Sequence, residues 1–253
     1  MTKSRHGRKP PTLRAMAFDQ FLEKEIPRKK LILPPWMPEK SATMIYAPRG
    51  VGKTQLVLGV AIAITSGGEI LGWKAATPRK VLIVDGEMPA FDLQSRLKQS
   101  IRARSVSRPR RRYLRLLCAD LQSRGIPDLG TDEGQEALDD VIEDEDVIIL
   151  DNLSTLCRSG RENEAESWAP IQDWALRMRR EGRSVLFVHH AGKGGAQRGT
   201  SRREDILDTV ISLRRPDDYS PADGARFEIH FEKSRGFMGE DAEPFEARLT
   251  ESG

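Results

Sequence analysis

Residues 47–54 have the composition and spacing of a loop that binds phosphate groups: Ala-Pro-Arg-Gly-Val-Gly-Lys-Thr. An apolar run at 43–46 precedes the loop and indicates a strand, and the apolar stretch 55–66 after it indicates a helix. The two glycines let the backbone curl so that successive N–H groups face a phosphate, and the new helix directs its positive dipole end at the same anion. Lys53 is then the countercharge for the β- and γ-phosphates, and the Thr54 hydroxyl is a ligand for Mg²⁺. We therefore predict a site for ATP and Mg²⁺ in which the nucleotide contacts Pro48, Arg49, Gly50, Val51, Gly52, Lys53, Thr54 and Gln55.

The loop departs from the usual pattern at one position, because Ala47 stands where the first glycine is normally found. That position only starts the turn, so alanine is compatible with it. A chance glycine-rich turn is the alternative interpretation. The strand before the loop and the helix after it favour phosphate binding instead.

Acidic residues follow two other apolar runs. ATP hydrolysis needs one carboxylate to hold the magnesium ion with its water shell and another to polarise the attacking water. Asp151 ends the run 147–150 and is the predicted magnesium residue together with Thr54. Asn152 occupies the next position, so the second acid must come from elsewhere, and we favour Glu87, just past the run 81–84, over Asp85. The alternatives are a turn aspartate at 151 and a helix-capping role for Glu87.

Two histidines, His189 and His190, end another apolar run, residues 184–188. In a parallel sheet the carboxyl ends of the strands form the ligand site, so one of them can sense a bound phosphate. We favour His189 for this role. The alternative is that both are structural residues.

Continuous apolar runs alternate with segments of helical spacing, which predicts an α/β fold with a mostly parallel sheet and helices on both faces. A basic tail, residues 1–17, is expected to be disordered and to precede a single domain, residues 18–253. The predicted strands are 43–46, 81–84, 114–117, 147–150, 184–188, 208–213, 226–232 and 244–249. The predicted helices are 18–26, 55–66, 90–102, 131–143 and 164–182, and 31–38 is expected to be extended.

Composition bounds the class of protein. Hydrophobic residues make up 38% of the 253 residues and charged residues 31%, which is typical of a globular protein. No apolar run approaches the roughly 18 residues of a membrane span, none resembles a secretory signal, and two cysteines offer no zinc-site spacing. We expect a cytoplasmic protein.

The basic residues are unevenly distributed. Residues 1–30 hold nine Lys/Arg and three Asp/Glu, and residues 98–115 hold eight Lys/Arg and no acid. Such blocks fit a polyanion, although a solvated surface is an equal alternative.

Taken together, these motifs resemble the RecA-like ATPases, in particular plasmid replicative helicases of the RepA type and the related short AAA family ATPases of plasmids and phages. The similarity covers about residues 20–250. The stretches that carry it are Trp36 with Pro38, and residues 50–54, 84–88, 149–153, 189–193, 198–201 and 233–235. The resemblance implies a RecA-like core with C-terminal antiparallel strands, ATP hydrolysis and assembly into a homo-oligomer, here a hexamer.

The resemblance also implies roles for two basic segments. Lys193 and Arg198 belong to a flexible loop that faces the central channel of similar rings, where they would contact single-stranded DNA. Lys233 and Arg235 alternate along a predicted strand, and in similar rings such a pair reaches the γ-phosphate of the neighbouring subunit. The alternatives are a solvent-exposed loop and a basic strand face.

Three functions are consistent with these features. The first is a hexameric motor or helicase that acts on single-stranded DNA in plasmid or phage replication, although an aromatic content of 6% provides no stacking platform. The second is a nucleotide-dependent switch or assembly factor that does not translocate. The third and least favoured is a small-molecule kinase in which residues 102–112 act as a lid over the phosphates.

Overall fold

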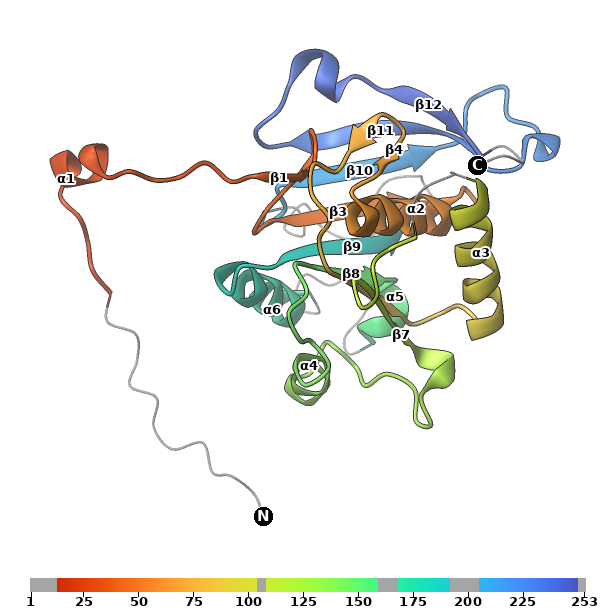
Figure 1. Ribbon diagram of the computed structural model, residues 1–253, viewed down its shortest axis with the longest axis horizontal. Coiled ribbons are helices and arrows are strands. Elements are labelled where there is room, and N and C mark those ends of the chain that lie inside the picture. Colours follow the sequence, from red (N-terminus) through yellow and green to blue (C-terminus); the bar gives the residue numbers. More distant parts are fainter. Residues whose placement is uncertain (1–12, 104–107, 159–167, 192–204, 250–253) are drawn as a thin grey trace.

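The computed structural model describes residues 13–103, 108–158, 168–191 and 205–249. An eight-stranded sheet forms the centre of the molecule, with the order β12-β11-β10-β3-β9-β8-β6-β7 (Figure 1). The six strands from β10 to β7 in this order are parallel, and β11 and β12 continue the sheet in antiparallel pairing. The strands are β3 (Ala42–Ala47), β6 (Val81–Asp85), β7 (Leu114–Cys118), β8 (Val147–Asp151), β9 (Ser184–His190), β10 (Thr209–Arg214), β11 (Arg226–Ser234) and β12 (Phe245–Arg248).

Helices cover both faces of this sheet. The helices α2 (Lys53–Ser66) and α3 (Ala90–Ala103) contribute to the apolar cluster on one face, and α4 (Asp132–Asp139), α5 (Leu153–Leu156) and α6 (Ala169–Arg180) contribute to the cluster on the other. Two small antiparallel pairs join the first cluster: β1 (Leu31–Leu33) with β2 (Met37–Pro38), and β4 (Glu69–Ile70) with β5 (Trp73–Lys74). Helix α1 (Phe18–Glu23) lies outside this three-layered body, at the end of an extended segment (Figure 1).

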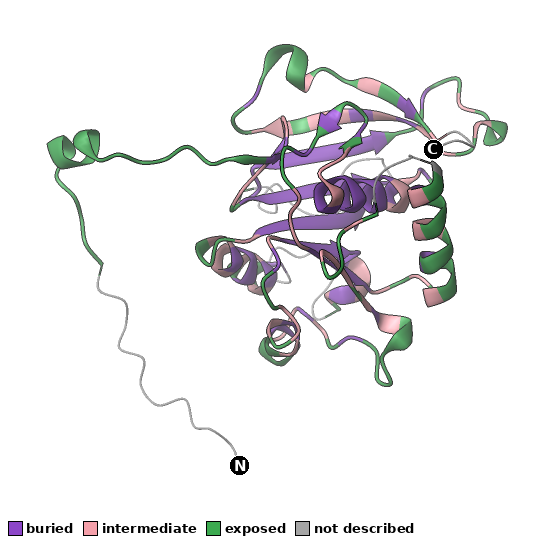
Figure 2. Cartoon of the chain, viewed as in Figure 1, coloured by how far each residue is buried: buried purple, intermediate pink, exposed green. Residues whose placement is uncertain are grey.

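The predicted fold class is confirmed. All eight predicted strands are present in the sheet, and their ends differ from the predicted ends by at most two residues. Continuous apolar runs form β3, β6, β8 and β9, which are buried along their whole length between the helices, whereas the edge strands β11 and β12 contain exposed residues (Figure 2).

All five predicted helices differ from their predicted bounds, and α2 and α3 differ least: α2 begins at Lys53 rather than at residue 55, and α3 ends at Ala103 rather than at residue 102. Helix α4 ends at Asp139 rather than at residue 143, because the acidic run that follows is unfavourable at the negative end of a helix dipole. Helix α1 ends at Glu23 rather than at residue 26. Helix α6 is described from Ala169, and residues 164–167 of the predicted helix lie outside the described part of the chain.

Helix α2 is apolar on all sides, and 11 of its 14 residues are buried. The sheet, the β4–β5 pair and α3 all contact it. Its C-cap is Gly67, whose backbone has a φ of +71° and whose N–H group donates a hydrogen bond to the carbonyl of Ala63. Glycine suits this left-handed position because it has no side chain to clash there.

The register of the parallel strands decides which polar side chains share a face. Asp85 pairs with Asp151, and Asp151 pairs with Val188 on the next strand. Val188 belongs to the apolar cluster on the α2 face. Because side chains alternate along a strand, Asp85, Asp151 and His190 all project to the α2 face.

Within the described ranges, no helix has the length and apolar character needed to cross a lipid bilayer.

Candidate functional site

The phosphate loop joins β3 to α2 at the carboxyl end of the central strand. Gly50 and Gly52 have φ values of +76° and +122°, which side-chain-bearing residues rarely adopt. A β-carbon on Gly52 would also lie 3.0 Å from the ring of Phe227. Ala47 does not have a positive φ, which explains why alanine is accepted at the position where this loop usually has glycine. No side chain caps the first turn of α2, so its N–H groups face the site as an anion-binding helix end.

Lys53 is the first residue of α2 and is buried. Its ammonium group donates hydrogen bonds to the carbonyl oxygens of Ala47 at 2.9 Å and Pro48 at 3.1 Å. Burial lowers the pKa of Lys53 to about 8, although the negative charges of Asp151 and Glu87 act in the opposite direction. The cation is therefore held against the loop by two neutral acceptors, which a phosphate can replace.

Asp151 ends β8 and is the second buried charge of the site. Burial raises its pKa to about 7, with a further contribution from the nearby charge of Asp85. Among the described residues, no donor forms a hydrogen bond to the Asp151 carboxylate. A buried carboxylate of this kind is incompletely solvated and has free lone pairs for a cation.

Asp85 ends β6 and is not equivalent to Asp151. Its carboxylate accepts hydrogen bonds from the N–H groups of Glu87 at 3.1 Å and Met88 at 2.7 Å. Burial nevertheless raises the pKa of Asp85. Asp85 therefore shapes the turn that carries Glu87, and of the two acids weighed from the sequence, Glu87 is the one that faces the cleft with an open carboxylate.

The carboxylate of Glu87 is held by two side chains from the ends of neighbouring strands. Asn152 donates a hydrogen bond to it, and Nε2 of His190 lies 3.4 Å from the same oxygen. Asn152 and His190 are also within 3.1 Å of each other. About half of the Glu87 side chain, 52%, is exposed, so the held carboxylate remains accessible to water.

His190, and not His189, lies in the cleft. His190 projects to the α2 face with Asp151, whereas His189 projects to the opposite face, which β9 shares with α5 and α6. The prediction that His189 is the histidine of the site was wrong. The apolar run 184–188 does not reveal how β9 aligns with β8, and this register decides which histidine faces the cleft. Burial and the charge of Lys53 lower the pKa of His190, which is therefore neutral at pH 7.

Helix α3 contributes a wall that the sequence did not reveal. Asp92, Arg96 and Gln99 line the cleft from this helix. They recur at intervals of four and three residues, while Leu93 and Leu97 point to the core, so helical spacing was the signal that could have identified them. On the opposite rim, the guanidinium of Arg215 is 3.5 Å from the carbonyl oxygen of Gly50.

These walls enclose a cavity of about 650 Å³, which is large enough for a nucleotide. Of the predicted nucleotide contacts, Arg49, Gly50, Gly52, Lys53, Thr54 and Gln55 line it, together with the predicted Glu87 and Asp151. Pro48 and Val51 belong to the loop but do not line the cavity; Val51 is buried in the apolar cluster.

Lys233 and Arg235 do not face the cleft of their own chain. The register places Lys233 opposite Val210, whose side chain belongs to the cluster on the α6 face. Strand β11 ends at Ser234, so Arg235 lies past the strand instead of alternating along it. The Arg235 guanidinium donates to the carbonyl of Asp205 at 3.2 Å, beside the amino end of β10. The predicted DNA contacts Lys193 and Arg198 lie outside the described residues.

The basic segment 108–112 is also remote from the cleft. It leads into Tyr113, whose carbonyl accepts a 2.7 Å hydrogen bond from Val81 at the amino end of β6. Arg112 is 3.8 Å from Glu143, which precedes the amino end of β8. The described part of the predicted kinase lid is therefore at the wrong end of the sheet to cover phosphates bound by this chain.

A magnesium ion fits the residues of the cleft. Mg²⁺ keeps several waters and is bound in proteins through one or two carboxylates together with substrate phosphates. Asp151 offers a buried carboxylate with free lone pairs, and Thr54 lines the same cavity. The described residues contain no group of three His, Cys, Asp or Glu side chains that could hold a metal by themselves. The site therefore suits a cation that arrives with a nucleotide.

A phosphate loop at the central strand, acids on two neighbouring strands and antiparallel strands at one edge define a RecA-like P-loop ATPase. The comparisons agree with this class. The sequence matches the AAA domain family over residues 8–196 of the 253, and the chain belongs to that family. The crystal structure of the RadB recombinase is similar in fold, with a TM-score of 0.57 and 15% identity, over 85% of this chain and 90% of that chain. No curated protein sequence matches the chain.

Proposed function

We propose that the protein hydrolyses ATP with Mg²⁺ as a homo-oligomer, and that it acts as a hexameric motor or helicase on single-stranded DNA in plasmid or phage replication. The observation that carries the hydrolytic part is the Glu87 carboxylate, which two side chains hold beside the phosphate loop while water still reaches it.

Binding begins at the loop. The N–H groups at the start of α2 bind the terminal phosphates, and the ammonium group of Lys53 exchanges its two carbonyl acceptors for phosphate oxygens. Thr54 and Asp151 would hold the magnesium ion. When bound, the ion neutralises charge on the β- and γ-phosphates. Because the pKa of Asp151 is about 7, cation binding at neutral pH is accompanied by loss of the proton that this carboxyl group partly retains.

Glu87 is the general base in this proposal. A water oxygen forms a bond to the γ-phosphorus as the bond to the bridging oxygen of ADP breaks, and the water proton passes to Glu87. Asn152 and the neutral imidazole of His190 orient the Glu87 carboxylate. His190 takes over the phosphate-sensing role that the sequence suggested for its neighbour, because it touches both Glu87 and Asn152.

The orientation of Lys233 and Arg235 supports a shared active site. Neither faces the cleft of its own chain, so a role in phosphate chemistry requires the cleft of a second copy. A cation supplied from a neighbour stabilises charge in the transition state, by a factor of about 10³–10⁵ in arginine-finger enzymes. The isolated subunit would then be a poor ATPase.

The proposal that the protein binds single-stranded DNA rests on charge and on the family resemblance. Residues 1–30 have an excess of Lys/Arg, and Lys193 and Arg198 lie in the segment that similar rings direct at their channel. Contacts of this kind are sequence-tolerant and weaken with salt.

The test is the rate of ATP hydrolysis per subunit, measured against protein concentration with and without single-stranded DNA. We expect the rate to rise with concentration, because the site is shared, and to rise further with DNA. A rate per subunit that rises with protein concentration but not with DNA would favour a switch or assembly factor that does not translocate. A rate independent of both would reject the shared site and the motor.

A variant of Glu87 and a matched control test whether Glu87 is the general base. Glu87→Gln should lower turnover by about 10²–10⁴-fold while nucleotide binding persists, as expected for loss of a general base. The matched control Glu240→Gln changes an exposed acid remote from the cleft and should have wild-type turnover. If both variants hydrolyse ATP at the same rate, Glu87 is not the base.

A further inference from the structure

Helix α3 has three sides with different surroundings. Leu93 and Leu97 pack against the core, and Asp92, Arg96 and Gln99 line the nucleotide cleft. The remaining side faces solvent. Figures 1 and 2 show α3 at the margin of the body, with much of its surface exposed. This outer side takes part neither in the core nor in the cleft.

Phe91, Lys98 and Arg102 form a stripe along the outer side of α3. They are seven and four residues apart, which places them within about 40° of one another around the helix axis. All three are exposed, and Phe91 keeps 77% of its accessible surface. The ammonium group of Lys98 donates a hydrogen bond to the side-chain oxygen of Gln94 at 2.6 Å. The stripe therefore presents an aromatic ring in line with two cations.

Three arginines continue this surface beyond the helix. Helix α3 ends at Ala103, and Arg108, Arg110 and Arg111 follow where the chain leads into β7. Five residues of chain span at most about 18 Å, so Arg108 lies within that distance of the helix end. All three arginines are exposed, and the Arg110 guanidinium lies over the ring of Tyr113 at 5.8 Å. We call the following set the α3 edge: Phe91, Lys98, Arg102, Arg108, Arg110 and Arg111.

The cations of the α3 edge have no acidic partner within the described ranges of the chain, unlike the basic residues next to them. Arg115 pairs with Glu143 at 3.2 Å and with Glu145 at 2.5 Å, and Arg112 is 3.8 Å from Glu143. The α3 edge thus holds five positive charges whose neighbours do not neutralise them. A cluster of this kind attracts a polyanion.

The acids close to Phe91 do not change this balance. Asp92 lines the cleft, and the carboxylate of Asp120 accepts a hydrogen bond of 2.9 Å from the N–H of Ala90. The second contact joins the start of α3 to the segment that follows β7, so it fixes the position of Phe91 on the surface. Exposed rings beside cations are typical of surfaces that bind single strands, because a ring stacks on an unpaired base while the cations contact phosphates.

We propose that the α3 edge binds single-stranded DNA, with its cations against the phosphates and the ring of Phe91 stacked on a base. Double-stranded DNA offers phosphates but no unpaired base, so its affinity is lower. The site is separate from the nucleotide cleft and from the loop of Lys193 and Arg198. It requires neither ATP hydrolysis nor assembly, and it therefore goes beyond the proposed function.

The first test concerns charge. The affinity of the full chain for a fluorescent oligothymidylate is measured by anisotropy at several salt concentrations, with and without ATP. Arg102→Gln/Arg111→Gln should lower the affinity at least tenfold. It should also reduce the slope of log K against log salt by about 1.4, because each phosphate contact with a single strand contributes about 0.7.

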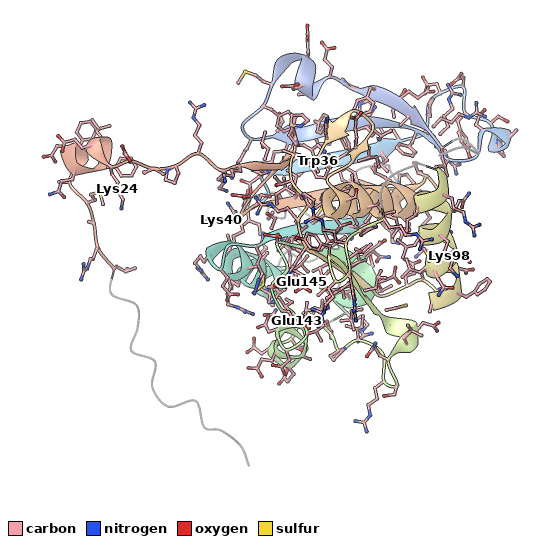
Figure 3. The ribbon with its side chains drawn as sticks, viewed as in Figure 1. Lys24, Trp36, Lys40, Lys98, Glu143 and Glu145 are labelled. Carbon is pink, nitrogen blue, oxygen red and sulfur yellow. The ribbon has the colours of Figure 1, made fainter. Side chains whose placement is uncertain are left out.

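The matched control removes the same charge from exposed positions elsewhere. Lys40→Gln/Arg180→Gln should bind the oligothymidylate like the wild type. Figure 3 shows Lys40 at the opposite margin of the body from Lys98. The substituted side chains of both double variants are exposed, so thermal unfolding, ATP affinity and the rate of ATP hydrolysis without DNA should match the wild type.

The second test concerns stacking. Phe91→Ala should lower the affinity for oligothymidylate at least fivefold with an unchanged salt slope, since it removes a stacking ring and no charge. Its affinity for a duplex of the same length should stay within twofold of wild type. Met238→Ala, which truncates another apolar side chain that is 83% exposed, should bind both DNAs like the wild type.

The outcomes separate this site from the DNA contacts of the proposed function. Loss of binding in Lys193→Gln/Arg198→Gln, with wild-type binding in the α3 edge variants, would reject the α3 edge and support the loop. The reverse pattern supports the α3 edge. A wild type that binds no DNA rejects both sites and leaves the ATPase standing. Equal affinity of the wild type for oligothymidylate, duplex and polyglutamate would reduce the α3 edge to a general polyanion surface and overturn the proposal.

Photo-cross-linking locates the bound base directly. Oligothymidylate that contains 5-iododeoxyuridine is irradiated with the wild type, and the linked peptide is identified by mass spectrometry. We expect the peptide that contains Phe91, and we expect its yield to fall at least fivefold in Phe91→Ala. Links confined to other segments of the chain would show that no base stacks on Phe91.

Discussion

Two buried carboxylates stand at opposite ends of β8 and have opposite surroundings. Glu145 precedes the amino end of the strand, where it accepts hydrogen bonds from Arg115 at 2.5 Å and from the N–H of Glu143 at 2.7 Å. Asp151 ends the same strand, and no hydrogen bond to its carboxylate is found in the described ranges. Figure 3 shows Glu143 and Glu145 on the side of the body away from Lys98 of α3, the helix that lines the cleft.

The difference separates an acid that supports the fold from one that awaits a ligand. A buried charge with a full set of partners holds segments together, and removing either partner is costly. A buried charge without partners opposes folding and gains its partner only when a cation binds. The following predictions test this contrast between Glu145 and Asp151.

The largest expected effect is on catalysis. Asp151→Asn should lower the steady-state rate of magnesium-dependent ATP hydrolysis by about 10²–10⁴-fold, because a metal ligand supplies several kcal/mol of charge stabilisation. Glu145→Gln keeps the shape of the side chain and should leave the rate per folded molecule within about twofold of wild type. Equal losses of the hydrolysis rate in both variants would show that Asp151 and Glu145 do not differ in this way.

The second effect is on stability, and here we expect the substitution of Glu145 to be the damaging one. Glu145→Ala should lower the free energy of unfolding by about 3 kcal/mol, since it leaves Arg115 and the N–H of Glu143 without their buried acceptor. Urea unfolding at pH 8 measures this change. A loss below about 1 kcal/mol would mean that Arg115 and Glu143 find other partners.

The third effect depends on pH. The pKa of Asp151 is about 7 in the folded protein and about 4 for an ordinary aspartate, so the folded state binds this proton more tightly. Its contribution to stability is fully present below pH 4 and is lost as the pH rises through 7. Asn cannot ionise, so Asp151→Asn should be more stable than wild type by about 1–3 kcal/mol at pH 8, and the difference should vanish near pH 4.

Chemical unfolding of both proteins at pH 4, 6 and 8 tests the sign. Lys53 titrates in a higher range: its pKa of about 8 is below the ordinary value of 10.5, so its unfavourable contribution to stability is full below pH 8 and declines as the pH rises from 8 to about 10.5. A wild type that is more stable than Asp151→Asn at pH 8, with magnesium and nucleotide absent, would show that Asp151 is not the strained member of the pair.

The smallest effect concerns the support of Glu87. Asn152→Thr keeps an oxygen that can cap α5, as the Asn152 side chain does at 3.3 Å to the N–H of Thr155, but removes the amide donor to Glu87. Turnover should fall by about three- to tenfold with little change in stability, because the Glu87 carboxylate has lost one of the two side chains that hold it. An unchanged turnover would limit Asn152 to capping.

The sequence predicted the sheet and the phosphate loop because both depend on local patterns. Apolar runs identified the buried strands β3, β6, β8 and β9, and glycines followed by a lysine identified the loop. What it could not provide was register. The choice between His189 and His190 depends on how β9 aligns with β8, which side-chain packing across the sheet determines.

Two other features depended on tertiary structure in the same way. The position of segment 108–112 at the amino end of the sheet follows from the start of β7 beside β6, which an arginine-rich run does not encode. The wall formed by Asp92, Arg96 and Gln99 required knowing that α3 borders the cleft. Helical spacing was visible in the sequence, but the partner of that helix face was not.

The enclosure of α2 constrains how the molecule can work. The sheet, the β4–β5 pair and α3 enclose the helix, so the N–H groups at its start have a fixed position relative to the core, although Pro48, Arg49 and Gly50 of the preceding loop are exposed. Any displacement that accompanies nucleotide turnover therefore has to occur in the peripheral segments at the mouth, such as α3 and the β10–β11 connection. Heating should likewise destroy nucleotide binding and the core in a single transition.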